Sequence, residues 1–124
     1  MIDFNNASFV KLGNASLDEA GQLLAGILLP TESVHMAYKG MRDWVVFTDR
    51  RVIAVNVQGL TGKKRDFSSL PYARIQAFSI ETAGHFDLDS ELELWFSGLG
   101  KVRLEFNNGV NIRAIGQLIS EKVL

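Results

Sequence analysis

The stretch FDLDSELELWFSGLGKVRLEF, residues 86–106, decides the fold. Up to Phe96, most even-numbered positions are apolar and most odd-numbered positions are acidic, and a β-strand sends these two sets to opposite faces. After a glycine-containing turn, apolar and charged residues alternate again from Lys101 to Phe106. The pattern predicts a hairpin with one face in water and one face in the core. The predicted core face carries Leu92, Leu94, Phe96, Val102, Leu104 and Phe106.

Five more segments earlier in the chain have the same strand-like character. Each combines alternating or β-branched residues with nearby glycine, proline or aspartate residues that end it. Together with the hairpin they predict seven strands within residues 33–107. Consecutive strands joined by short turns favour an antiparallel barrel or sandwich. The five segments are 34–39, 44–48, 51–57, 63–69 and 75–80.

A helix is expected before the strands. Ser16 and Glu19 form a capping box, apolar residues follow at helical spacing, and Pro30 ends the segment. These signals predict a helix over residues 16–29. Residues 1–15 are asparagine-rich with isolated phenylalanines, which indicates an extended lead-in.

A second helix is predicted after the strands, over residues 111–123. Asn111 is a suitable N-cap, and apolar residues recur at helical spacing from Ile112 onward. A seven-stranded antiparallel sheet leaves an open end and bare edges, which promote aggregation unless they are covered. We therefore expect Ile115 and its apolar neighbours to pack across the open end of the barrel.

The composition indicates one domain in the cytoplasm. The chain has 124 residues, a usual length for a single domain. It has no cysteine, which excludes disulfide frameworks and thiolate chemistry and is typical of a reducing compartment. A formal net charge of −1 argues against nucleic acid as a partner and against bulk attraction to an anionic membrane. No apolar stretch approaches the ~20 residues that span a bilayer, and no signal peptide is expected.

The order of these elements resembles that of bacterial pleckstrin-homology (PH-like) domains. Residues 43–53, DWVVFTDRRVI, contain an FT-x-x-R-hydrophobic turn that is similar to one in this family. Residues 61–64, 70–75 and 81–89 are similar to its later segments, so the resemblance covers about residues 16–123. It implies a mainly β (α+β) fold: a PH-like seven-stranded antiparallel barrel or sandwich, capped by a C-terminal helix and carrying an extra N-terminal helix.

The resemblance also implies a binding and assembly module and not an enzyme, because the family has no known enzymatic chemistry. The residues support this reading, since His35 and His85 are isolated in sequence from any serine or carboxylate partner. Neighbouring carboxylates on one strand face lie roughly 7 Å apart, too far to converge on one calcium ion. Arg50 and Arg51 are expected at a surface turn. We therefore predict no catalytic residue, no metal site and no cofactor.

The outward face of the predicted hairpin is the candidate oligomer interface. Trp95 lies there among charged residues, although tryptophan is enriched where a partner covers it. Two interpretations remain open: a partner covers Trp95, or the N-terminal helix covers it and the acidic row faces water. The candidate interface residues are Trp95, Glu93, Arg103, Asp87, Asp89 and Glu91.

The expected partner is a second copy of the chain. Members of the PH-like family of this type resemble ring-forming homo-oligomers, and the chain carries acidic and basic segments at different positions. Complementary surfaces at different positions make head-to-tail contacts, which close into a ring when the rotation permits. A homo-oligomeric ring is therefore the first functional prediction, and another protein is a further candidate partner.

A basic segment favours the alternative function of binding an anion or a phospholipid headgroup. A glycine turn followed by basic side chains can hold a phosphate. Eukaryotic PH domains often bind phosphoinositides through a basic motif between the first two strands, whereas the turn over residues 39–43 is short and includes Asp43. A solvated edge that resists aggregation is the competing interpretation. The candidate anion-binding residues are Gly62, Lys63, Lys64, Arg65, Lys39 and Arg42.

Overall fold

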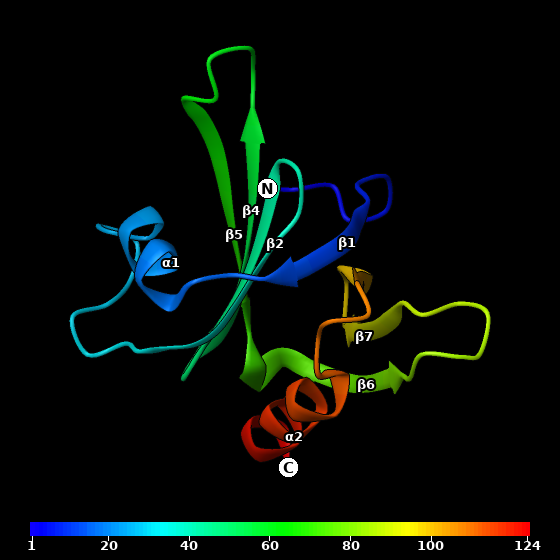
Figure 1. Cartoon of the computed structure of the whole chain (residues 1–124). Coiled ribbons are helices and arrows are strands. Elements are labelled where there is room, and N and C mark those ends of the chain that lie inside the picture. The colour runs from blue at the N-terminus through cyan, green and yellow to red at the C-terminus, as the bar shows by residue number, and fades with distance from the viewer.

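Eight strands in one mixed sheet and two helices make up the fold (Figure 1). The structure is a computed structural model that describes all of residues 1–124. The helices are α1 (Leu17–Leu23) and α2 (Ile112–Val123), and a short 3₁₀ turn, η1 (Tyr72–Arg74), separates β5 from β6. The strands are β1 (Phe9–Asn14), β2 (Val34–Lys39), β3 (Asp43–Thr48), β4 (Arg51–Gln58), β5 (Lys64–Pro71), β6 (Ile75–Glu81), β7 (Ser90–Phe96) and β8 (Gly100–Phe106).

The sheet has the order β5-β4-β3-β2-β1-β8-β7-β6. β1 therefore joins two antiparallel meanders: the first consists of β2–β5 and the second of β6–β8. β1 pairs antiparallel with β2 and parallel with β8. The mainly β architecture with a helix before and after the strands is confirmed, but the prediction of seven antiparallel strands is wrong. Residues 1–15, expected as a lead-in, contain an eighth strand. Its pairing shifts register between Phe9 and Leu12, and Lys11 has a φ of 53°, so two core residues lie three positions apart and show no alternation.

β7 and β8 form the hairpin that the alternating pattern predicts. Leu92 lies opposite Leu104 and Leu94 lies opposite Val102, and all four side chains are buried. Phe106 is also buried in the same core. The predicted register is therefore confirmed, because a slip of one residue would have turned these side chains toward water.

The start of this hairpin differs from the prediction. β7 begins at Ser90 and not at residue 86, and residues 82–89 form a loop that extends to the right in Figure 1. The partner strand β6 ends at Glu81, opposite Glu91, so the earlier residues have no strand to pair with. Phe86 is consequently 97% exposed. Residues 86–89 alternate in sequence but lie outside the sheet, so their alternation does not mark a strand.

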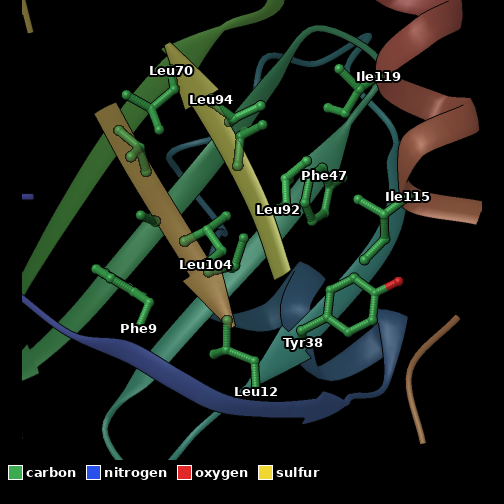
Figure 2. Packing of buried hydrophobic residues seen from close by; sticks show 14 of the residues in the cluster. Phe9, Leu12, Tyr38, Phe47, Leu70, Leu92, Leu94, Leu104, Ile115 and Ile119 are labelled. Atoms are coloured by element: carbon green, nitrogen blue, oxygen red, sulfur yellow. The ribbon is translucent and has the colours of Figure 1, made fainter. Parts of the chain in front are cut away.

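α2 closes the open end of the barrel, as predicted. Ile115 and Ile119 are fully buried and lie beside core side chains of the sheet, including Phe47 (Figure 2). The Asn111 side chain accepts a hydrogen bond from the backbone N–H of Ala114 at 3.1 Å, which identifies it as the N-cap. The main core therefore draws on both meanders, on β1 and on α2.

α1 packs on the outer face of the first meander. Ser16 accepts a hydrogen bond from the backbone N–H of Glu19 at 3.2 Å, as the capping box predicts. The helix ends at Leu23, short of the predicted residue 29, and the chain then turns through Gly26, whose φ of 83° cannot continue a helix. Neither α1 nor α2 has the length and apolar character required to cross a membrane. The second, smaller core beneath α1 contains Ala20, Leu24, Ala37, Val46, Ile53 and Val55.

Candidate functional site

The FT-x-x-R motif of the β3–β4 turn builds an ion pair in which Glu32 is buried and Arg51 is mostly covered. Arg51 donates two hydrogen bonds to the carboxylate of Glu32, from Nε at 2.8 Å and from Nη2 at 2.7 Å. Thr48 Oγ1 donates to the same carboxylate at 2.7 Å and accepts from the backbone N–H groups of Arg50 and Arg51. The hydrogen bonds from Arg51 lower the pKa of Glu32 to about 2, although burial acts in the opposite direction. Arg50 is exposed in the turn, as expected, whereas Arg51 is mostly covered and structural, so the expectation is wrong for Arg51.

This ion pair ties three parts of the fold together. Arg51 also donates from Nη2 to the carbonyl oxygen of Ile27 at 3.0 Å and from Nη1 to Ser69 Oγ at 2.9 Å. The backbone N–H of Leu29 donates to Glu32 at 3.1 Å. Every oxygen of the carboxylate has a partner within the chain, so the cluster fixes the segment after α1 and offers no free group for chemistry. Sequence reasoning missed Glu32 because it lies in a loop, 19 positions from its partner.

Trp95 is half exposed on the outer face of the second meander. Its side chain is 49% exposed, and it lies between Ala77 on β6 and Lys101 on β8. A hollow of about 190 Å³ adjoins it, lined also by Ser79 and Glu93. α1 lies over β2–β4 and leaves this face bare. Of the two interpretations of Trp95, the one in which the N-terminal helix covers it is wrong.

The charged residues around Trp95 are already paired within the chain. Arg103 contacts both carboxylate oxygens of Glu91 at 2.7 Å, and Lys101 Nζ lies 3.2 Å from Glu93. The hydrogen bond and charge of Glu91 raise the pKa of the Arg103 guanidinium. The outer face of the second meander thus brings together four of the predicted residues, Trp95, Glu93, Arg103 and Glu91. The three charged ones already form ion pairs within the chain.

Asp87 and Asp89 do not belong to that face. Both lie in the 82–89 loop, where Asp87 accepts a hydrogen bond from the backbone N–H of Asp89 at 3.1 Å. Asp89 also lies 3.8 Å from Lys11 Nζ. Burial and the neighbouring Asp89 raise the pKa of Glu105. The predicted acidic row is therefore divided between a strand and a loop.

The basic candidates gather at one end of the first meander. The β2–β3 and β4–β5 turns lie side by side, because Arg42 Nη2 donates to the carbonyl oxygen of Gly59 and Val57 N–H donates to the carbonyl oxygen of Arg42 at 2.9 Å. Gly62, with a φ of 68°, shapes the second turn. Lys39 contributes least to this basic group, because its Nζ lies 3.2 Å from the Glu19 carboxylate and over the Trp44 ring.

The tips of these turns carry a feature that sequence reasoning missed. Met41 and Leu60 are fully exposed, at 101% and 106%. Their position within turns flanked by glycine was the available signal. None of the four surface hollows is lined by these residues or by the basic residues beside them.

The two histidines lie apart from each other in the structure. His35 and His85 are exposed and lie on separate elements. No group of three or more His, Asp or Glu side chains is arranged to hold a metal ion.

Relatives of the chain are found along nearly its whole length. A family model described as Bacterial PH domain matches residues 3–123. The uncharacterized protein YjqA of Bacillus subtilis strain 168 is 48% identical over 114 residues, which span 88% of this chain and 91% of that protein. The uncharacterized protein YozO of the same strain is 35% identical over 71 residues, or 57% of this chain and 61% of that protein.

Solved structures share the fold. The crystal structure of a DUF1696 family protein with a pleckstrin-homology domain from Shewanella loihica PV-4 matches with a TM-score of 0.81 and 39% identity, over 93% of this chain and 99% of that one. The pleckstrin homology domain from Shewanella amazonensis SB2B matches with a TM-score of 0.70 and 39% identity, over 96% of this chain and 93% of that one. The chain therefore belongs to the bacterial PH domain family.

Proposed function

We propose that this protein is a non-enzymatic binding module that self-associates through the outer face of β6–β8. The observation that carries the proposal is Trp95, which stands half exposed beside a hollow while the charges around it are paired within the chain. Covering an exposed aromatic side chain lowers the free energy of the complex. Because the charged neighbours are paired with each other, removing water from them costs less than it would for isolated charges.

The energy of such a contact comes mainly from the apolar surface. Covering the exposed half of an indole removes roughly 100 Å² from water and contributes about 2–3 kcal/mol. A stable interface also needs a total area on the order of 1,000 Å² or more, so Trp95 acts as an anchor within a larger patch. The ion pairs Arg103–Glu91 and Lys101–Glu93 then lie at the rim, where charge sets orientation more than affinity.

A closed ring is the form that we propose for the oligomer. A surface centred on Trp95 that binds a different surface of the next copy makes a heterologous contact, and such contacts close into rings when the rotation permits. The assembled ring would present many copies of one domain to a further protein partner.

Light scattering of the unmodified protein and of Trp95→Ala tests this proposal. The unmodified protein is expected to be an oligomer at micromolar concentration, and Trp95→Ala to raise the dissociation constant of the contact at least about tenfold. Leu29→Ala is the matched control, because Leu29 is 47% exposed in the loop after α1. An oligomer that is unchanged by Trp95→Ala would place the contact elsewhere.

A second candidate function is binding of an anion or a phospholipid headgroup at the paired β2–β3 and β4–β5 turns. The observation in its favour is that Lys63, Lys64 and Arg65 are exposed, make no ion pair and lie at the same end as Arg42. Titration with inositol hexakisphosphate, followed by backbone amide chemical shifts, tests it. Shifts confined to residues 39–43 and 59–65 support the candidate, and unchanged shifts contradict it.

A further inference from the structure

The largest hollow of the surface lies in the corner between β5 and β6. These two strands are the edges of the sheet, and they do not pair with each other. The chain passes from one to the other through η1, at the lower centre of Figure 1. The barrel therefore stays open at this corner. A hollow of about 410 Å³ remains there, and we call it the corner hollow.

The inner wall of the corner hollow is apolar. Leu70 at the end of β5, Ile75 at the start of β6 and Phe96 at the end of β7 line it, and all three are buried members of the main core. Leu99 in the β7–β8 turn forms a further wall and is partly buried against the same core. A hollow of a few hundred Å³ that reaches apolar core side chains is typical of a site for a small molecule.

The rim of the corner hollow is polar and carries one positive charge. Arg74 in η1 lines the hollow, is exposed and forms no ion pair within the chain. No Asp or Glu side chain lines the hollow, so nothing in the corner neutralises the guanidinium. The exposed side chains of Gln76 and Ser97 also line it and can donate hydrogen bonds. An apolar wall and a single unpaired cation thus lie in one hollow.

The other three hollows do not combine these two features. In the hollow beside Trp95, Lys101 is paired with Glu93. In the hollow beside β1, Arg103 is paired with acidic neighbours. In the hollow between β6 and α2, Arg113 forms no ion pair, but most of the lining residues are not apolar. The corner hollow is therefore the best site for a ligand that is both apolar and anionic.

We propose that the corner hollow binds a small carboxylate with an apolar chain, such as a medium-chain fatty acid. The apolar chain would lie against Leu70, Ile75 and Phe96, and the carboxylate would accept hydrogen bonds from the Arg74 guanidinium. One guanidinium matches one carboxylate in charge and can donate to both of its oxygens. A phosphate dianion would keep uncompensated charge at this rim and would leave the apolar wall uncovered. The inference goes beyond the proposed function and does not depend on self-association.

Calorimetric titration with decanoate tests the site, because it measures binding whatever the oligomeric state of the protein. Decanoate is expected to bind with a submillimolar dissociation constant. Decyltrimethylammonium has the same chain and the opposite charge, and acetate has the charge without the chain. Each should bind at least about tenfold more weakly than decanoate. Decanoate should also raise the temperature of thermal unfolding, as a ligand of the folded state does.

Two variants locate the ligand in the corner hollow. Arg74→Gln removes the charge and should raise the dissociation constant for decanoate at least about tenfold. Ser97→Phe fills the hollow from the β7–β8 turn and should abolish binding at the same concentrations. Arg113→Gln is the matched control and should leave binding unchanged, because Arg113 is also exposed without an ion pair but lies on α2. Circular dichroism of every variant establishes that it is folded.

The possible results separate this inference from the proposed function. A monomeric protein that binds decanoate through Arg74 overturns only self-association. An oligomer that does not bind decanoate, or that binds decyltrimethylammonium equally well, overturns only the corner site. Binding that survives both Arg74→Gln and Ser97→Phe overturns it as well. Binding that is kept in Arg74→Gln, but lost when Lys63 and Lys64 are both changed to glutamine, would assign the carboxylate to the paired turns instead.

Discussion

The two meanders differ in what covers their outer faces. Each carries an outward tryptophan and a two-point arginine–carboxylate pair. On the first meander, Trp44 packs partly buried against the small core under α1, and in the Arg51–Glu32 pair the Glu32 side chain is fully buried and that of Arg51 is 20% exposed. On the second, Trp95 is half exposed and the Arg103–Glu91 pair lies at the surface. The same side-chain chemistry therefore packs inside the chain on one face and lies exposed on the other.

Breaking the Arg51–Glu32 pair of the first meander should lower the free energy of unfolding far more than breaking the Arg103–Glu91 pair of the second. Glu32→Leu leaves Arg51 with an uncompensated charge, and removing one partner of a buried pair costs roughly 3–5 kcal/mol in the free energy of unfolding. Urea denaturation measures this change. A loss below about 1 kcal/mol would mean that the pair does not hold the segment after α1 to the sheet.

Acid should weaken the first meander through the same carboxylate. The pKa of Glu32 is lowered from an ordinary value of 4.5 to about 2 in the folded state. The stabilisation of about 3 kcal/mol is therefore complete above pH 4.5 and is lost as the pH falls toward 2. Urea denaturation at several pH values tests this, with Glu32→Gln as the control that should flatten the dependence. A Glu32→Gln variant with the full acid dependence would contradict it.

The two tryptophans should differ in their effect on monomer stability. Trp44→Ala removes contacts with the core beneath α1 and should cost about 2 kcal/mol. Trp95→Ala removes few contacts within the chain and should cost less than about 1 kcal/mol under conditions that keep the protein monomeric. Thermal unfolding at low protein concentration compares them, and equal losses would remove the distinction between the two faces.

The smallest effect is expected at the exposed pair of the second meander. Glu91→Gln should change the free energy of unfolding by about 0–1 kcal/mol, because exposed ion pairs contribute little. Its effect should fall further at high salt. A loss comparable to that of Glu32→Leu would show that burial does not separate the two pairs.

The sequence pattern predicted the structure correctly where the segment packs against a neighbouring element of the fold. The alternation of residues 90–106 predicted the β7–β8 register, and the helical spacing after Asn111 predicted the cover of the barrel end. The same alternation misled over residues 86–89, since nothing in a local pattern shows where the neighbouring strand stops. β1 was missed because the irregularity at Lys11 breaks its period.

The positions of the candidate interface residues were predictable only for those that lie on strands. Trp95 and its charged neighbours followed from strand alternation alone. The ion pairs Lys101–Glu93 and Arg103–Glu91 join β8 to β7 and determine which charged side chains lack a partner. These pairs depend on side-chain conformation, which the local sequence does not show. The Glu32–Arg51 pair and the adjacency of the two turns at Gly59 both join positions at least 17 residues apart, which no local pattern encodes.

The native mass of the unmodified protein tests most directly whether the bare face of the second meander is covered by another copy. Light scattering coupled to size exclusion at micromolar concentration gives that mass without labels. A whole-number multiple of the 13.8 kDa chain mass, reduced by Trp95→Ala and unchanged by Leu29→Ala, is the predicted result. A mass of 13.8 kDa for the unmodified protein would contradict self-association and leave Trp95 exposed to water.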